Sequence, residues 1–174
     1  MYSMQFNVAQ LLKESIGATR DHLVKADIAG LDPALRPSRL LTGQVHFLRT
    51  RSGILVEGEL QTEIELMCAR CLDPLYTPLH LSLVEEFSPT IDVITGHRLV
   101  MEEEDKALWI DEHHILDLSD VVRQGLLLLI PMRPLCRQDC MGLCPVCGQN
   151  LNERPCDCAE KETDIRWAQL LTLR

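Results

Sequence analysis

The sequence predicts an α+β fold: an antiparallel β-sheet or partly open barrel, a packed core helix and a C-terminal cysteine-rich, zinc-ribbon-like segment. Three observations predict it. Apolar and polar residues alternate through the middle of the chain, which is the pattern of half-buried strands. An apolar run at 121–130 follows capping residues and precedes a proline, as in a helix. Six of the eight cysteines then fall between Cys136 and Cys158.

Length and composition limit the size of this fold. The 174 residues suit one domain with a small appendage, so we expect a core domain at 1–131 and a cysteine-rich zinc-binding segment at 132–174 packed on it. Hydrophobic residues make up 46% of the chain but aromatic residues only 4%. The core is therefore expected to consist mainly of Leu, Ile and Val side chains.

The N-terminal part predicts one helix and one strand. Residues 7–16 place apolar side chains on one helical face, with Asn7 as the N-cap and Gly17 as the stop. Residues 23–28 are predicted to form a strand. Two prolines then mark a loop.

The central part predicts an antiparallel meander. Apolar residues occupy the even positions from Ile54 to Cys68, and mostly glutamates occupy the odd ones. The segments 45–47 and 79–83 alternate in the same way, on either side. Cys68 and Cys71 are therefore expected at the tip between two strands, a normal place for a zinc knuckle.

The C-terminal half predicts less regular structure around one helix. Residues 88–107 are acidic and loop-like, and 107–110 are expected to form a short strand. The helix at 121–130 is apolar nearly all round in its second half, so we expect it to be the central core helix, ended by Pro131. A helical turn is expected at 164–171, packing back on the protein.

Cysteine spacing predicts two four-thiolate sites. Thiolates two residues apart in a Gly/Pro-rich turn can converge on one tetrahedral ion. The simplest site combines such a pair with the Cys-x-Cys that follows, namely Cys144, Cys147, Cys156 and Cys158. The remaining thiols form the other site, namely Cys68, Cys71, Cys136 and Cys140. Swapped sets, such as Cys140 with Cys144 and Cys147, are left open by the spacing.

One or two structural Zn²⁺ ions are the expected occupants of these sites. The first residues show no secretory signal, so we expect reduced thiols in the cytoplasm, which favours metal over disulfides. Iron–sulfur spacing of the Cys-x-x-Cys-x-x-Cys type does not occur. Catalytic zinc usually needs a His or water ligand, and 136–158 contains no His.

A catalytic reading of the thiols is the main alternative. Arg70 could lower the pKa of a thiol at Cys68 or Cys71, as in a thiol oxidoreductase. The thioredoxin-type motif, however, opens a helix, whereas this pair is predicted between strands. His113 and His114 show no metalloenzyme spacing. We therefore expect no enzyme activity, with an oxidoreductase or other metalloenzyme as the alternative.

Charge is acidic and localised. The formal net charge is -9, and eleven acids against two bases lie between Glu85 and Asp120. Proteins that bind RNA through its backbone are normally basic. The longest apolar run, 126–130, falls far short of the roughly 20 residues that a membrane helix needs, so no membrane is expected.

Several motifs together resemble the YceD-type family of large ribosomal RNA subunit accumulation proteins. The similarity covers most of the chain, and the first forty residues match only loosely. The residues that carry it are Cys68-Ala69-Arg70-Cys71-Leu72, Leu128–Pro131, Leu135–Asn152, Cys156-Asp157-Cys158 and Asp164–Leu170. The resemblance implies a non-enzymatic, zinc-binding role in assembly of the large ribosomal subunit, with a ribosomal protein or a pre-ribosomal large-subunit particle as partner.

A protein with this acidic charge could take part in ribosome assembly in two ways. The stretch 85–120 could hold a basic ribosomal protein before it meets RNA. Alternatively, a local basic patch could contact rRNA directly despite the global charge. A generic zinc-ribbon adaptor between proteins is a further alternative. The candidate patches are Arg36, Arg39, Arg49 and Arg51, or Arg133 and Arg137.

Overall fold

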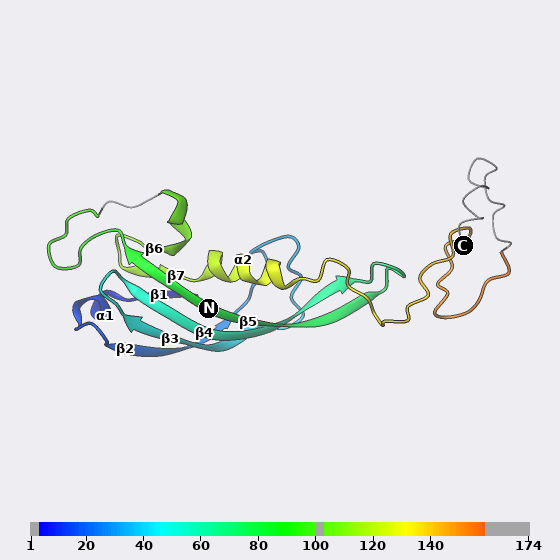
Figure 1. The fold of residues 1–174 in the computed structure, drawn as a ribbon, viewed down its shortest axis with the longest axis horizontal. Helices are drawn as coiled ribbons and strands as arrows, with labels where there is room; N and C mark the ends of the chain where they lie inside the picture. Colours follow the sequence, from blue (N-terminus) through cyan, green and yellow to red (C-terminus); the bar gives the residue numbers. More distant parts are fainter. Residues whose placement is uncertain (1–3, 100–102, 159–174) are drawn as a thin grey trace, which may run out of the picture. The chain divides into compact units, whose positions relative to one another are not determined.

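The computed structural model describes residues 4–99 and 103–158, which fall into two compact units (Figure 1). The first unit comprises the described part of Met1–Leu66 together with Tyr76–Met132. The second comprises Met67–Leu75 and the described part of Arg133–Arg174. The predicted packing of 132–174 on the core stays a prediction, and the second unit also takes in a turn from the middle of the chain.

Five strands form one open sheet. In spatial order they are β2 (Thr19–Ala26), β3 (Leu41–Arg49), β4 (Ile54–Met67), β5 (Pro74–Pro89) and β6 (Trp109–Ile110). The β2–β3 and β3–β4 pairs are antiparallel, whereas β5 and β6 are parallel. The order has two ends, so the sheet is open and does not close into the predicted partial barrel. The predicted central meander is confirmed.

Alternation along β4 separates the core from the outer face, as predicted. Apolar residues at even positions are buried, and the odd-numbered residues between them point to the other face. Gly43 on β3 lies opposite Leu60, and a Cβ there would sit 2.0 Å from the Glu59 carbonyl oxygen. A glycine is therefore required for the two strands to approach this closely. The buried β4 residues are Ile54, Val56, Leu60, Thr62 and Ile64.

The N-terminal segment differs from the prediction. A two-stranded sheet joins β1 (Gln5–Asn7) to β7 (Ile115–Asp117), and α1 (Ala9–Lys13) is shorter than the expected helix at 7–16. Asn7 pairs with Ile115 in this ladder, so its backbone is extended, and its side chain accepts a hydrogen bond from the Ala9 N–H at 3.1 Å. Pairing with a strand from a distant part of the chain thus outweighs the local helical pattern.

The segment before β6 also departs from the expected strand at 107–110. Residues Glu103–Leu108 form a 3-10 helix, η1, and only Trp109–Ile110 is extended. Strand β6 is short because it pairs only with the last two residues of β5, Ser88 with Trp109 and Pro89 with Ile110.

Helix α2 (Ser119–Leu129) packs along one face of the sheet (Figure 1). Its buried residues are Val121, Val122 and Leu126, and a Cβ at Gly125 would meet a Leu81 methyl at 2.6 Å. Leu128, in contrast, is 87% exposed. The helix expected at the centre of the core does contribute buried residues, but it lies on the core with one side only and exposes part of its apolar second half.

Two further predictions concern the ends of α2 and the chain. The Asp117 carboxylate accepts a hydrogen bond from the Ser119 N–H at 2.8 Å at the start of α2, but the N-cap position is Leu118, which makes no side-chain capping bond. The helical turn predicted at 164–171 lies outside the described residues. None of the helices in the described residues is both long and apolar enough to span a bilayer.

Candidate metal centres

The eight thiols gather into two groups of four within the second unit. Inside each group the four sulfur atoms all lie within 4.8 Å of one another. The first cluster is Cys68, Cys71, Cys136 and Cys140. The second cluster is Cys144, Cys147, Cys156 and Cys158. These are the members of the simplest partition predicted from spacing, and Cys140 does not join the Cys144–Cys147 pair.

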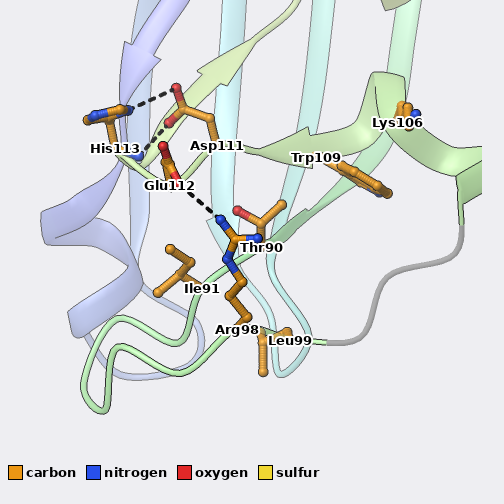
Figure 2. Close-up of a pocket in the computed structure, with 9 residues that line it drawn as sticks. All are labelled: Thr90, Ile91, Arg98, Leu99, Lys106, Trp109, Asp111, Glu112 and His113. Atoms are coloured by element: carbon orange, nitrogen blue, oxygen red, sulfur yellow. Dashed lines mark hydrogen bonds and ion pairs between the residues drawn. The ribbon is translucent and has the colours of Figure 1, made fainter.

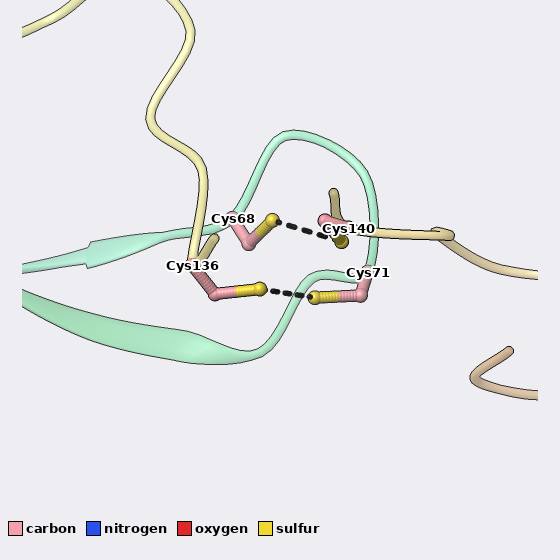
Figure 3. A group of neighbouring side chains, drawn as sticks. All are labelled: Cys68, Cys71, Cys136 and Cys140. Atoms are coloured by element: carbon pink, nitrogen blue, oxygen red, sulfur yellow. Dashed lines mark hydrogen bonds between the residues drawn. The ribbon is translucent and has the colours of Figure 1, made fainter. Parts of the chain in front are cut away.

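Sulfur distances in the first cluster match those of a shared metal ion (Figure 3). The Cys68 and Cys140 sulfurs are 3.8 Å apart, and those of Cys71 and Cys136 are 3.6 Å apart. Four sulfurs about 2.3 Å from one tetrahedral ion would lie about 3.8 Å from each other, whereas a disulfide bond is about 2.05 Å long. The geometry fits tetrahedral metal coordination.

Two chain segments distant in sequence build the first cluster. A tight turn between β4 and β5 holds Cys68 and Cys71, with hydrogen bonds from the Cys68 N–H to the Asp73 carbonyl (2.9 Å) and from the Leu72 N–H to the Cys68 carbonyl (3.0 Å). The Ala69 N–H donates to the Pro134 carbonyl at 2.8 Å. This backbone contact brings the segment that carries Cys136 and Cys140 to the turn.

Side chains also tie these segments together. The Arg70 guanidinium donates to the Cys140 carbonyl at 2.9 Å, so it holds the two segments together; thiol activation by Arg70 was considered only as the alternative. The Asn150 amide donates to the Asp73 carboxylate at 2.7 Å. A Cβ at Gly142 would lie 3.3 Å from the Arg70 carbonyl oxygen, and Gly142 has a φ of +74°. Only glycine adopts that conformation without strain at such a close approach.

Asn152 is a functional residue that sequence reasoning missed. Its Nδ2 donates to the Cys140 sulfur at 3.3 Å, while its Oδ1 accepts from the Met141 N–H at 2.8 Å and from Arg137 at 2.7 Å. It therefore orients a ligand and stabilises negative charge on its sulfur. The sequence signal was present in the Asn-Leu-Asn that follows the cysteine block, but it carried no assigned role.

The second cluster is built locally. The Cys144 N–H donates to the Gln149 carbonyl at 2.8 Å, and the Gly148 N–H donates to the Cys144 carbonyl at 2.9 Å. Gly148 has a φ of +74°, which lets the chain turn just past the second ligand. The Gln149 amide donates to the carbonyls of Arg154 and Pro155, which holds the loop that returns to Cys156.

Backbone amides in both knuckles favour thiolates. The N–H groups of Cys71 and Arg70 lower the pKa of Cys68 to about 6. The N–H groups of Cys147 and Val146 lower the pKa of Cys144 to about 6 in the same way. Because metals bind the thiolate, this arrangement prepares each turn for a cation.

Burial differs between the clusters. Cys68, Cys71 and Cys140 are buried with Leu75, Leu135 and Leu143 packed against them, and Cys136 is exposed. In the second cluster Cys144 is buried and Cys147 is exposed. The sulfur-only donor set suits Zn²⁺, and four protein ligands fill its tetrahedral coordination.

A pocket of the first unit is lined by charged side chains and by Trp109 (Figure 2). This cavity of about 690 Å³ lies beside β6. Four of its titratable side chains are paired with one another, Arg98 with Glu112 at 3.5 Å and His113 with Asp111 at 3.8 Å. The side chain of His113 is 77% exposed, so His113 is a surface residue.

Several acids of the stretch 85–120 serve local structure. Asp92 accepts hydrogen bonds from the N–H groups of Ile94 and Thr95, and these bonds lower the pKa of its carboxyl, those from Thr95 most. Asp111 accepts from the N–H groups of His113 and Ile115. These acids hold turns, so less of the stretch is available to a basic partner than the sequence suggested.

Fewer arginines of the candidate basic patches are free for RNA than the sequence suggested. Arg49 donates to the carbonyls of Leu12, Thr50 and Gly53 at 2.6–3.3 Å, so it holds the protein together. Arg137 contacts Asn152 and pairs with Asp139 at 3.5 Å. Arg39 pairs with Glu63 at 3.4 Å, and Arg36, Arg51 and Arg133 are exposed. Contact between these arginines and rRNA stays a prediction.

Fold and clusters together define a class of protein: a small α+β chain whose second unit is built around two four-thiol clusters. The chain belongs to the YceD family, described as large ribosomal RNA subunit accumulation proteins, which it matches over residues 56–174. The predicted family is therefore confirmed. The match includes all eight cysteines.

Individual relatives agree with this assignment. A chloroplastic large ribosomal RNA subunit accumulation protein homolog of Arabidopsis thaliana is 30% identical over 151 residues, which cover 75% of this chain and 47% of the relative. An uncharacterised protein of Mycobacterium tuberculosis is 35% identical over 121 residues, or 70% of this chain and 56% of the relative. The chain thus spans about half the length of these relatives. No solved structure matched it.

Proposed function

We propose that this protein is a non-enzymatic factor for accumulation of large-subunit rRNA, and that it acts in the cytoplasm during assembly of the large ribosomal subunit. The family match supports the process. The partner is a large-subunit ribosomal protein or a pre-ribosomal particle. The observation that carries the non-enzymatic part is the closed geometry of the thiol clusters.

Each cluster is proposed to hold one structural Zn²⁺. A catalytic zinc keeps a coordination position open for water or substrate, whereas four converging sulfurs leave none. The first cluster joins Met67–Leu75 to the segment that begins at Arg133, beside hydrogen bonds such as that from Arg70 to the Cys140 carbonyl, in a unit whose apolar contacts are a few leucines. The free energy of metal binding would then contribute directly to folding of this unit, as it does in small zinc domains.

Complementation tests this function. A bacterial strain that lacks its own YceD-family gene would receive the wild-type chain, the Cys68→Ser/Cys71→Ser variant or the surface control Gln138→Ala. We expect the wild type and the control to restore the ratio of large- to small-subunit rRNA, and the double variant to fail together with loss of bound zinc. A wild-type protein that is expressed, folded and zinc-loaded but leaves the rRNA ratio unchanged would contradict the proposal.

The same variants distinguish the structural proposal from the alternative that the protein is a thiol oxidoreductase. An enzyme of that kind would reduce a disulfide substrate, and the double variant would lose turnover while keeping its fold. Under the structural proposal, thiol reactivity of the zinc-loaded chain is low. The Cys68→Ser/Cys71→Ser change instead loosens the second unit, which limited proteolysis detects.

A further inference from the structure

One face of the five-stranded sheet is uncovered within the described residues of the first unit. Helix α2 and the apolar core lie on the opposite face (Figure 1). On the uncovered face, which we call the outer face, the side chains come from odd positions of β2 and β4 and even positions of β3 and β5. Large apolar side chains are exposed there: Leu23 is 83%, Val84 62% and Tyr76 60% exposed.

Charge on the outer face is nearly all negative. Among the outward positions of β2–β5, all of which the structure describes, Lys25 is the one lysine or arginine. The acids form a line along β4 with further members on its neighbours, namely Asp21, Glu57, Glu59, Glu63, Glu65 and Glu86. Alternate residues on a strand are about 6.6–6.8 Å apart, so the β4 glutamates repeat at that interval.

These glutamates differ from the acids of the stretch 85–120. Glu57 and Glu59 are exposed, and their carboxylates make no hydrogen bond or ion pair with the described residues, whereas Asp92 and Asp111 hold turns. Like charges in a row on one strand repel each other and destabilise the free protein. An oppositely charged partner would relieve that repulsion.

Shape adds a second feature to the charge. A hollow of about 420 Å³ lies on the outer face where Glu57 and Glu59 of β4 meet Ser82 and Val84 of β5. A second hollow of about 200 Å³ lies further along, beside Pro78 and His80, where Glu63 is already paired with Arg39 at 3.4 Å. The first hollow is therefore the shallow site beside two unpaired carboxylates, with Val84 next to it.

We propose that the outer face is a docking surface for a basic, partly apolar polypeptide segment. Its carboxylates would pair with Lys or Arg side chains, and Leu23, Tyr76 and Val84 would receive apolar ones. An RNA backbone would be repelled by the same carboxylates. This inference deepens the proposed function, because it gives the partner's chemistry: a basic protein. It rests on the proposed function only in placing that partner in assembly of the large ribosomal subunit.

Peptide binding tests the surface directly. The probe is a fluorescein-labelled 12-residue peptide of alternating arginine and threonine, titrated with the full zinc-loaded chain in about 50 mM salt. The test variant is Glu57→Gln/Glu59→Gln/Glu65→Gln. The matched control, Asp27→Asn/Glu112→Gln/Asp120→Asn, removes the same amount of charge elsewhere on the first unit, where each acid is exposed.

We expect the test variant to bind the peptide at least tenfold more weakly than the wild type, and the control to stay within about twofold. Equal weakening in both variants would overturn the proposal, because binding would then follow net charge alone. So would absence of peptide binding, tight binding of a single-stranded RNA that the test variant loses, or self-association of the wild type that the test variant abolishes. Matched thermal unfolding confirms that all three chains fold.

Complementation distinguishes this inference from the proposed function. If the test variant loses the peptide but restores the rRNA ratio, the docking surface is not used and the proposed function stands. If the wild type binds the peptide through the outer face but does not change the rRNA ratio, the proposed function fails and the docking surface stands.

Discussion

Asn152 shows how one polar side chain can position a candidate metal ligand. It contacts the Cys140 sulfur, the Met141 amide and the Arg137 guanidinium at once. Residues that orient a ligand in this way typically contribute about 10–100-fold to metal affinity. We therefore expect Asn152→Ala to weaken zinc binding about tenfold, measured by competition with a chromogenic chelator. The control Gln138→Ala changes an exposed residue of the same loop, and equal affinities for both variants would contradict the assigned role.

Glu86 gives a second prediction at this scale. Hydrogen bonds from Ser52 and Thr50 lower the pKa of its carboxyl from the ordinary 4.5. A depressed folded pKa contributes stability that is present above about pH 4.5 and lost as the pH falls through the folded pKa. Ser52→Ala should raise the pKa of Glu86 toward 4.5 in a carboxyl NMR titration. An unchanged pKa would show that the Ser52 bond is not formed in solution.

Individual residues mark the limit of what the sequence predicts. The eight cysteines can be recognised from their spacing, which also predicts the observed partition as the simplest one, but only the structure excludes swapped sets such as Cys140 with Cys144 and Cys147. Asn152 and Arg70 cannot be recognised in this way, because an amide or a guanidinium beside a cysteine has many other uses. The role of Arg70 depends on a contact with Cys140, 70 residues away, and that of Asn152 on contacts with residues 11 to 15 positions before it.

Strand β3 carries the sharpest prediction at the scale of elements. A Cβ at Gly43 would lie 2.0 Å from the Glu59 carbonyl oxygen, so Gly43→Ala must move backbone. We expect a loss of about 3 kcal/mol in the free energy of unfolding. At Gly125 the obstacle is a Leu81 methyl, which can shift, and alanine adds helix propensity, so Gly125→Ala should stay within about 1 kcal/mol. Urea denaturation measures both, and the reverse order would contradict the packing described.

Elements with strong periodicity were predicted well, and those fixed by distant contacts were not. The alternation in β4 gives its full length because one face is buried and the other is not. Helix α1 is shorter than its pattern because Asn7 is drawn into the ladder with β7. The exposed Leu128 of α2 could not be predicted either, since composition does not tell which apolar residues a sheet covers.

The two units of the molecule differ in what stabilises them. The first unit has a large apolar core, whereas the described part of the second has the thiol clusters and a few leucines. Removal of metal with a strong chelator should therefore raise amide hydrogen exchange at 67–75 and 133–158 at least tenfold. Exchange in β3 should change little. Uniform loss of protection across β3 would show that the units do not unfold independently.

Native mass spectrometry of the reduced chain, before and after chelation, tests the central claim most directly. The account predicts two zinc ions per chain, with all eight thiols protected from alkylation until the metal is removed. One ion would contradict the two-site partition. No ion, with thiols that react freely, would contradict the structural role of the clusters and favour a thiol-based activity.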